Sequence, residues 1–342
     1  MKVLIIHPRA PIYGGAERVI VKLCEYMSNK TIVHALAMPN IPPEMREELN
    51  NQGTPTISTL PGLLSNINNF DIINFHNFPS TLFAMFTNKP MVWYCNEPPE
   101  MFTSPRRKFI EWGNRNLVRN RIENVVVADK FNAKRLADLY KITPKIIPYG
   151  IDYEFFSQVK QNPDKDYFTV MQVGTISRYK NQLTTIQSVA EARKVIPNIR
   201  LWLIGNVSEP DYSRVLEGAI RNLGLGGRVN NEPHVTREHL RYLYSKANVL
   251  LHPVKDQGGW LSPFEAISAG CPVIVSNELT CSDIIENNQL GLVARDYPKA
   301  LKMVHDYPIL NDHAKNWVKE NLTWSKFGES MVKNFEEILH KK

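Results

Sequence analysis

A short basic segment of the sequence precedes a predicted helix. In GTISRYKNQ (174–182), Arg178 and Lys180 come just before a helix that we expect to begin near Asn181. The first N–H groups of a helix are free and lie at the positive end of its dipole, so two cations beside them suit a diphosphate. A solvated basic turn would have the same composition, and this segment alone does not choose between the two.

The most specific segment is HPVKDQGGWLSPFEAISAGCPVIVS (252–276). Its pattern predicts a strand ending at Pro253, a glycine-bearing loop, a helix and another strand. Glu265 lies in the first two turns of that helix, where its carboxylate can accept hydrogen bonds from ligand hydroxyls. A carboxylate that only caps its own helix would explain Glu265, but it would not explain the loop glycines Gly258 and Gly259.

Two adjacent glycines open a third segment, YGGAERVI (13–20). Gly14 and Gly15 follow the first predicted strand, and they would let a ligand oxygen approach the backbone at a helix start. The spacing is not the GxGxxG of a dinucleotide-binding loop. Taken alone, the pair is better explained as a strand-to-helix turn.

Composition limits the class of protein. The 342 residues include 41 Lys and Arg against 34 Asp and Glu, a net charge of +7 that favours anionic partners. No nucleic-acid reading module is present. No run approaches the roughly 20 apolar residues of a membrane span, and Val3–Ile6 is too short for a signal peptide. The four cysteines lack metal-ligand spacing and suit a reducing compartment, so we expect a soluble cytoplasmic protein.

Short apolar runs alternate with helix-period segments from end to end. Such runs predict parallel sheets covered by helices on both faces, and therefore an α/β fold. A turn-rich segment at 145–170 separates two βαβ series. The last helix, 324–340, is rich in apolar residues and must dock on something. The expected strands are 3–7, 71–76, 91–95, 125–128, 168–174, 200–205, 248–253 and 272–276.

Several motifs follow the order found in family-4 glycosyltransferases of the GT-B fold, and the sequence resembles that family over nearly its whole length. GGAERV resembles the family's glycine-rich loop, IPYGIDYEFF its interdomain segment and VGTISRYKNQ its donor-phosphate loop. FEAISAGCPVIVS and SDIIENNQLGLV then follow in the expected order. Each match is weak alone, but the fixed order makes a strong combined signal.

The resemblance implies two Rossmann-like domains, each with a doubly wound parallel sheet, facing each other across a cleft. Residues 1–152 with 325–342 would form the N-terminal acceptor domain, and residues 153–324 the domain that binds a nucleotide-sugar donor. The final helix would cross back to the first domain, which would explain its apolar content.

The resemblance also implies roles for single residues. Lys180, with Arg178, would neutralise the donor diphosphate, and Glu265 would hold the ribose hydroxyls. Asn96 and Glu97 would lie near the reacting sugar carbon, and with Arg178 and Lys180 they form the expected catalytic set. The expected donor-binding residues are Gly14, Gly15, Thr175, His234, Val235, Gln257, Gly259, Trp260, Leu261 and Glu265.

Three positions depart from the family pattern. The first Glu of the E-x7-E motif is Gln257, which can hydrogen-bond a sugar but carries no charge. Thr175 replaces the Arg that usually follows the glycine of the phosphate loop, and Arg178 is its expected substitute. Asn96 occupies the place of a common His, so it can donate a hydrogen bond but cannot act as a base. His76 is either a satisfied strand-end histidine, which we favour, or a polar contact at the cleft.

The expected reaction is retaining glycosyl transfer. Cleavage of the glycosyl–phosphate bond places charge on the leaving diphosphate, which fixed cations and helix-end amides would stabilise. We expect no metal and no cofactor beyond the donor substrate, because Arg178 and Lys180 could stabilise the leaving group and no His/Asp cluster suggests a metal site. Two alternatives stay open: a non-catalytic GT-B protein that binds a sugar nucleotide or a partner, and, with a poorer fit to the motif order, a sugar-nucleotide epimerase.

The most basic segment is 103–122, and it places cations beside aromatic residues. Such a helix suits an anionic membrane surface, where a lipid-linked acceptor or another glycan would be met on the cytoplasmic face. A helix packed on the core with a solvated basic edge is at least as good an interpretation. The residues expected at the acceptor or membrane are His76, Arg106, Arg107, Lys108 and Trp112.

Overall fold

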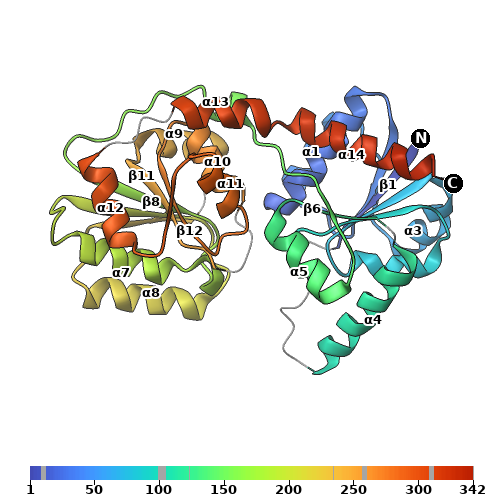
Figure 1. Ribbon diagram of the computed structural model, residues 1–342, viewed down its shortest axis with the longest axis horizontal. Helices are drawn as coiled ribbons and strands as arrows, with labels where there is room; N and C mark the ends of the chain where they lie inside the picture. The colour runs from blue at the N-terminus through green and yellow to red at the C-terminus, as the bar shows by residue number, and fades with distance from the viewer. Residues whose placement is uncertain are drawn as a thin grey trace. The chain divides into compact units, whose positions relative to one another are not determined.

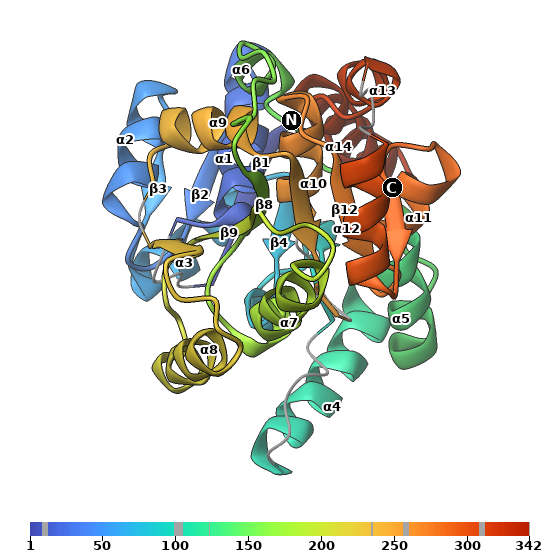
Figure 2. The same ribbon diagram turned by 90° about the vertical axis from the view of Figure 1, so that its left-hand side faces the viewer.

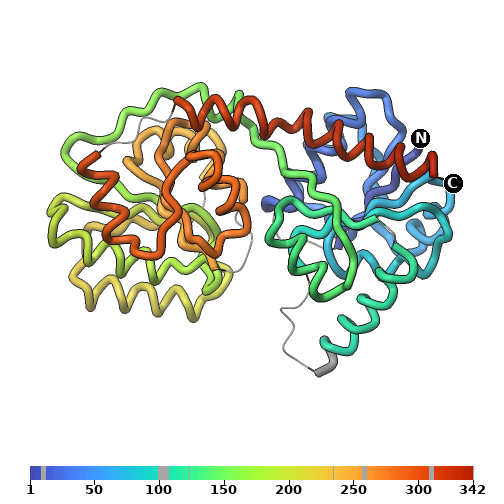
Figure 3. The backbone as a smooth tube through the Cα atoms, in the orientation of Figure 1, coloured from blue at the N-terminus to red at the C-terminus, as the bar shows by residue number. Residues whose placement is uncertain are grey.

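The computed structural model describes residues 1–8, 13–98, 105–122, 124–233, 235–255, 260–307 and 312–341, with the side chains of 105–107 left aside. The chain divides into two compact units. The first contains Met1–Gly150 and Trp324–Lys342, and the second contains Ile151–Thr323. Both ends of the chain therefore belong to the first unit (Figure 3).

A seven-stranded parallel sheet forms the centre of the first unit, in the order β3-β2-β1-β4-β5-β6-β7 (Figure 1). Ile5 of β1 lies opposite Leu36 of β2 and Asn74 of β4. The central strands are buried along almost their whole length, as their apolar runs predicted. The strands are β1 (Lys2–Ile6), β2 (Val33–Ala37), β3 (Thr56–Ile57), β4 (Ile72–His76), β5 (Met91–Tyr94), β6 (Asn124–Val127) and β7 (Lys145–Ile146).

Helices cover both faces of this sheet. The α-helices of the first unit are α1 (Gly15–Asn29), α2 (Pro43–Asn51), α3 (Leu60–Asn66), α4 (Pro105–Arg121), α5 (Lys130–Tyr140) and α14 (Trp324–Leu339), with 3-10 turns η1 (Ile67–Asn69) and η2 (Ser80–Phe86). Helix α14 packs along α1 and buries Phe327, Met331 and Phe335. The approach is so close that a Cβ atom added at Gly328 would lie 2.2 Å from Cγ of Tyr26. The expectation that the last helix docks is confirmed.

The second unit has a six-stranded parallel sheet in the order β10-β9-β8-β11-β12-β13. The chain moves outward from β8 to β10 and then returns to β11 on the other side of β8. Ligands of open α/β sheets bind at such a reversal, beside the carboxyl ends of the strands. The strands are β8 (Phe168–Val173), β9 (Ile199–Ile204), β10 (Val229–Glu232), β11 (Val249–His252), β12 (Val273–Ser276) and β13 (Leu292–Ala294).

Helices α7 and α8 lie on one side of this sheet, and α9 and α10 lie on the other (Figures 1 and 2). Helix α12 packs against α7, and α13 packs against α10. The helices are α6 (Tyr153–Phe156), α7 (Gln182–Ala192), α8 (Pro210–Asn222), α9 (Arg237–Lys246), α10 (Leu261–Ser268), α11 (Ser282–Asn287), α12 (Tyr297–Asp306) and α13 (Asp312–Asn321), with a 3-10 turn η3 (Arg178–Lys180).

The eight predicted strands are confirmed as β1, β4, β5, β6, β8, β9, β11 and β12. The alternation of strands and helices therefore predicted the class and most of the central strands. None of the helices within the described residues combines the length and the apolar character needed to cross a membrane.

Candidate active site

The segment after β8 holds the side chain of Lys180 against the end of that strand. A Cβ atom added at Gly174, where φ is +139°, would lie 3.2 Å from Cε of Lys180. The side-chain amide of Gln172 in β8 also donates a 2.7 Å hydrogen bond to the carbonyl of Lys180. The glycine therefore makes room for the lysine stem, and the ammonium group is carried at the carboxyl edge of the sheet.

Arg178 begins the same 3-10 turn, two residues before Lys180, and lies in a different environment. Its side chain is 64% exposed, and its Nε lies 3.5 Å from Oε2 of Glu209. The guanidinium also lies over the ring of Tyr212, 5.4 Å from the centroid. The two cations of this segment are therefore held differently: Arg178 pairs with Glu209, and the stem of Lys180 lies against Gly174 at the end of β8.

Asn181 connects this segment to the loop after β11. It adopts the left-handed conformation (φ 60°), which asparagine tolerates better than most residues. Its Nδ2 donates a 3.0 Å hydrogen bond to the carbonyl of Pro253, and its Oδ1 accepts one of 2.8 Å from Thr184. The two segments that carried the strongest sequence signals are thus joined at the reversal between β8 and β11.

Glu265 lies in the second turn of α10, and the residue just before this helix, Trp260, is buried. The Trp260 ring is 4% exposed and lies 4.9 Å from that of Phe264. Tyr244 of α9 donates a 3.4 Å hydrogen bond to Oε2 of Glu265. Burial, and then the neighbouring Glu265 carboxylate, raise the pKa of Tyr244 well above its ordinary value, so its hydroxyl keeps its proton and fixes the carboxylate.

The other expected donor contacts are only partly described. Thr175 and Val235 are both partly exposed, after β8 and just before α9 respectively, and Leu261 is the first residue of α10. Thr175 accepts a 2.9 Å hydrogen bond from Gln182 through its carbonyl, which fixes the turn into α7. His234, Gln257 and Gly259 lie outside the described residues.

Asn96 follows β5 in the first unit and is held by three hydrogen bonds. Its Oδ1 accepts from the Tyr149 hydroxyl (2.5 Å), its N–H donates to Oδ1 of Asn77 (3.2 Å), and its carbonyl accepts from Asn132 (3.1 Å). Its Nδ2 is buried and has no partner among the described residues. The amide can therefore offer a fixed hydrogen-bond donor. Glu97, the next residue, is partly exposed.

The paired glycines serve the fold of the first unit. The N–H of Gly14 donates a 2.9 Å hydrogen bond to Oε2 of Glu17, and a Cβ atom at Gly14 would lie 3.1 Å from the same oxygen. The other oxygen of Glu17 lies 2.9 Å from Nε2 of His7, at the end of β1. Sequence reasoning missed this buried pair, although the adjacent Glu in GGAER was a signal. Gly15 is exposed as the first residue of α1.

His76 is fully buried at the end of β4. Its ring stacks on Tyr94 with centroids 5.3 Å apart, and its Nε2 accepts a 3.0 Å hydrogen bond from Asn74. Burial, and then the nearby His7, lower the pKa of His76 well below its ordinary value. These contacts support the interpretation of His76 as a histidine of the sheet.

Helix α4 exposes an aromatic pair. Phe109 is 71% exposed and Trp112 is 61% exposed, and their rings stack with centroids 5.9 Å apart. Lys108 beside them is exposed as well. The opposite face, which includes Asn114 and Val118, is buried in the unit.

Three of the basic residues of α4 are used within the protein. Arg115 pairs with Glu111, Arg119 donates to the carbonyl of Tyr140, and Arg121 donates to that of Thr87. The side chains of Arg106 and Arg107 lie outside the described structure. The basic segment is therefore divided between internal hydrogen bonds and the end of the helix that carries Lys108.

No group of three His, Cys, Asp or Glu side chains is placed to hold a metal ion in the part of the chain that the structure describes. The four cysteines are buried, and none of them forms a disulfide. The described polar groups at the strand ends are cations, carboxylates and amides, which bind sugars and phosphates through hydrogen bonds and charge.

Two family models match the chain. One, described as glycosyl transferases group 1, matches residues 154–321, and the other, glycosyltransferase family 4, matches residues 13–155. With the two doubly wound sheets, these matches define a glycosyltransferase of the GT-B class. The chain belongs to glycosyltransferase family 4.

Among the curated relatives, the O-antigen chain mannosyltransferase RfbU of Salmonella typhimurium is 29% identical over 131 residues, which are 36% of this chain and 37% of the relative. The D-inositol 3-phosphate glycosyltransferase of Mycobacteroides abscessus is 22% identical over 162 residues, or 45% of this chain and 37% of the relative. The matched part of the chain thus spans little more than a third of the length of either relative.

A solved structure resembles the chain along its whole length. The crystal structure of Anabaena Alr3699/HepE in complex with UDP-glucose aligns with a TM-score of 0.84 and 15% identity, covering 98% of this chain and 100% of that one. At this identity the likeness shows the GT-B fold.

Proposed function

We propose that the chain moves a sugar from a nucleotide diphosphate sugar to an acceptor hydroxyl, with retention of the anomeric configuration. The observation that carries this proposal is the hydrogen bond from Asn181 to the carbonyl of Pro253. It brings the segment of Lys180 beside the loop that leads into α10 and Glu265. A cation and a hydroxyl-binding carboxylate thereby belong to neighbouring loops at the reversal of one sheet.

The donor would lie along the carboxyl edge of the second sheet. Lys180 would meet the diphosphate, with Arg178 as a weaker contributor because Glu209 already pairs with it. Glu265, fixed by Tyr244, would accept hydrogen bonds from the ribose hydroxyls. The main-chain groups at Val235 and at Trp260–Leu261 would contact the base and the sugar.

The reaction would break the bond between the sugar's anomeric carbon and the diphosphate oxygen, which leaves with the electron pair. The acceptor oxygen would form the new bond to the same carbon, and its proton would pass to the departing diphosphate oxygen. Lys180 would stabilise the growing charge on the diphosphate, more strongly in the transition state than in the bound substrate. Asn96 would hold a sugar or acceptor hydroxyl through its partnerless Nδ2 rather than act as a base.

A donor screen would identify the sugar and the base of the nucleotide-sugar donor. UDP-glucose is bound in the Anabaena structure, and the Salmonella relative is a mannosyltransferase. A thermal-shift screen of the full chain against UDP- and GDP-sugars should therefore reveal one preferred donor. Transfer would then be measured with that donor and a panel of glycan and lipid-linked acceptors, with the anomeric configuration of the product determined by NMR.

The outcomes separate the alternatives. Acceptor-dependent release of nucleoside diphosphate supports the proposal. Binding of a donor without transfer or hydrolysis across the panel would identify a non-catalytic binding protein. Release of an isomerised sugar and UDP with no acceptor would identify an epimerase.

We also propose that α4 contacts an anionic membrane surface and brings the enzyme to a lipid-linked acceptor. Figures 1 and 2 show α4 extending beyond the first sheet, and this helix carries the exposed Phe109–Trp112 stack beside Lys108. Aromatic side chains partition into the interfacial region while a neighbouring ammonium group meets anionic head groups. The enzyme would then be a peripheral protein of the cytoplasmic face.

A further inference from the structure

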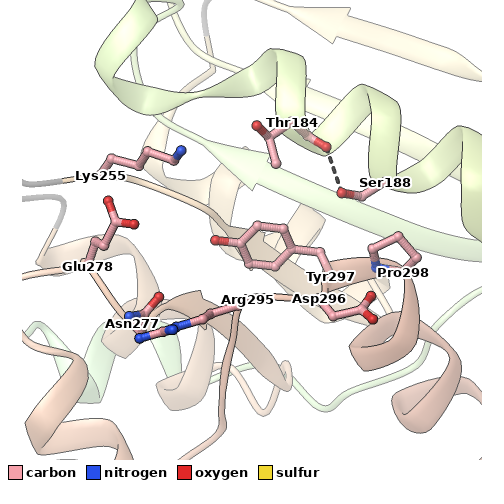
Figure 4. Close-up of a pocket in the computed structure, with 9 residues that line it drawn as sticks. All are labelled: Thr184, Ser188, Lys255, Asn277, Glu278, Arg295, Asp296, Tyr297 and Pro298. Atoms are coloured by element: carbon pink, nitrogen blue, oxygen red, sulfur yellow. Dashed lines mark hydrogen bonds between the residues drawn. The ribbon is translucent and has the colours of Figure 1, made fainter.

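A recess of about 500 Å³ opens in the second unit at the carboxyl ends of β11, β12 and β13. Figure 4 shows it between α7 and the beginning of α12. No residue that we assign to the donor is among those that line it. Its volume falls in the range of small-molecule sites, so it can hold a ligand separate from the donor.

Charged side chains of both signs line this recess. Within the described residues, neither Lys255 nor Glu278 takes part in an ion pair. Figure 4 shows both of them at the end of the recess where the hydroxyl of Tyr297 lies. Arg295 lies 3.2 Å from the side-chain oxygen of Asn277, once that amide is oriented to accept from the guanidinium. Two cations and one carboxylate are therefore available to a ligand.

The other carboxylate of the recess belongs to Asp296, at the start of α12. Oδ1 of Asp296 accepts a 3.1 Å hydrogen bond from the N–H of Lys299 and so caps the start of α12. The four charged side chains of the recess sum to zero, but the negative charge of Asp296 lies at the positive end of the α12 dipole. Lys255 and Arg295 therefore remain the groups that can meet the anionic part of a ligand.

The floor and one wall of the recess suit a sugar ring. Tyr297 is 7% exposed, so its side chain forms part of the wall of the recess. Its ring and Pro298 present carbon atoms to the recess. Ser188 donates its own proton to the carbonyl of Thr184 (2.7 Å), so its oxygen can accept from a ligand hydroxyl.

From this arrangement we infer that the recess binds a small anionic carbohydrate of the hexose phosphate or hexuronate class. Lys255 and Arg295 would hold the anionic group. Glu278 would accept hydrogen bonds from ring hydroxyls, and Tyr297 would pack against the C–H face of the sugar. This binding does not depend on the proposed glycosyl transfer.

A ligand in the recess would also contact residues near both partners of the hydrogen bond between Asn181 and Pro253. Thr184, a lining residue, donates its hydroxyl proton to Oδ1 of Asn181, and Lys255 follows two residues after Pro253. We therefore expect binding in the recess to change donor affinity, and donor binding to change the affinity of the recess by the same factor.

The test is calorimetric titration of the full chain with glucose 6-phosphate, glucuronate, glucose and inorganic phosphate. At least one of the two anionic sugars should bind saturably, and glucose at least about 10-fold more weakly. Lys255→Ala and Arg295→Ala should each weaken that binding at least about 10-fold. Arg214→Ala, which removes an exposed cation from α8, should leave it unchanged, and thermal unfolding would show that each variant is folded. No saturable binding of either anionic sugar, or binding indifferent to Lys255 and Arg295, would overturn the inference.

A second set of titrations separates the recess from the donor site. If the anionic sugar only occupies the donor phosphate position, Lys180→Ala will abolish its binding, and excess UDP will displace it completely. That result would also overturn the inference. A separate site is supported if Lys180→Ala still binds the anionic sugar, and if the change that UDP causes in the affinity for this sugar levels off once UDP is saturating. Failure to detect glycosyl transfer would leave these binding measurements unaffected.

Discussion

The side-chain amide of Asn181 lies 3.0 Å from the carbonyl oxygen of Pro253 and joins two loops that are 72 residues apart in the sequence. Asn181 ends the turn that carries Lys180, and Pro253 begins the loop that leads to α10. Together with the pairing of β8 and β11, this hydrogen bond holds the segment of Lys180 beside the loop that leads to Glu265. This bond makes the proposed donor site testable residue by residue.

Lys180→Ala should weaken donor binding or turnover at least about 10-fold, equivalent to about 1.4 kcal/mol, because it removes the cation nearest the end of β8. Calorimetry with the preferred donor and steady-state kinetics would measure the change. The matched control is Lys194→Ala, which removes an exposed lysine that pairs with Glu191. Equal donor affinity in the two variants would remove Lys180 from the site.

Asn181→Asp should raise the donor KM about 5-fold, the equivalent of one net hydrogen bond of about 1 kcal/mol, because a carboxylate cannot donate to the Pro253 carbonyl. Asn181→Gly keeps the left-handed backbone without the amide, so it should show a similar loss. If both variants bind the donor as the parent does, the connection has no role in the site.

Gly328→Ala should destabilise the first unit by about 1–3 kcal/mol, because the new methyl group would overlap the base of the Tyr26 side chain and force α14 away from α1. Gly218→Ala in α8 is the matched control. A Cβ atom there meets nothing within 4 Å, so the change should stabilise by about 0.5–1 kcal/mol through helix propensity. Urea unfolding followed by circular dichroism would compare them, and equal stabilities would contradict the close packing.

Glu17 should make the first unit sensitive to acid. Burial alone would raise the pKa of Glu17, but the hydrogen bond and charge of His7 outweigh it and leave this pKa below its ordinary value of 4.5. A lowered folded-state pKa means that the ionised carboxylate stabilises the fold above pH 4.5, and that this contribution disappears as the pH falls through the folded-state value.

The comparison is urea unfolding of the parent and Glu17→Gln at pH 7, 5, 4 and 3. The parent should be more stable at pH 7 by an amount on the order of 1 kcal/mol, and the difference should shrink below pH 4.5. A difference that stays constant with pH would show that the His7–Glu17 contact is not ionic.

The double variant Phe109→Ser/Trp112→Ser should float less readily with anionic vesicles, because it removes the stacked pair that α4 exposes. Flotation with phosphatidylserine-containing and neutral phosphatidylcholine vesicles would measure it. Tyr307→Ser is the control, since Tyr307 is 78% exposed on the second unit. Equal recovery of the parent with both kinds of vesicle would argue against an anionic membrane contact.

The regular core of each unit follows directly from local sequence. Runs such as Val3–Ile6 and 168–174 are apolar on both faces, and only a central parallel strand buries such a run completely. The strands that prediction missed are β2, β3, β10 and β13. Among them, β3 has two residues, and the edge strand β10 is Val-Asn-Asn-Glu. Such strands are held by pairing with a neighbour, which leaves little pattern in their own residues.

By itself, the sequence determined the two βαβ series, the family and the segments that carry Lys180 and Glu265. Only the tertiary structure decided how single side chains are used. Arg178 and Lys180 are both cations of the same short segment. In the structure, Arg178 pairs with Glu209, whereas the side chain of Lys180 lies against Gly174. Partners of this kind come from distant parts of the chain. The local periodicity that predicts an element contains no information about which charge will lie opposite it.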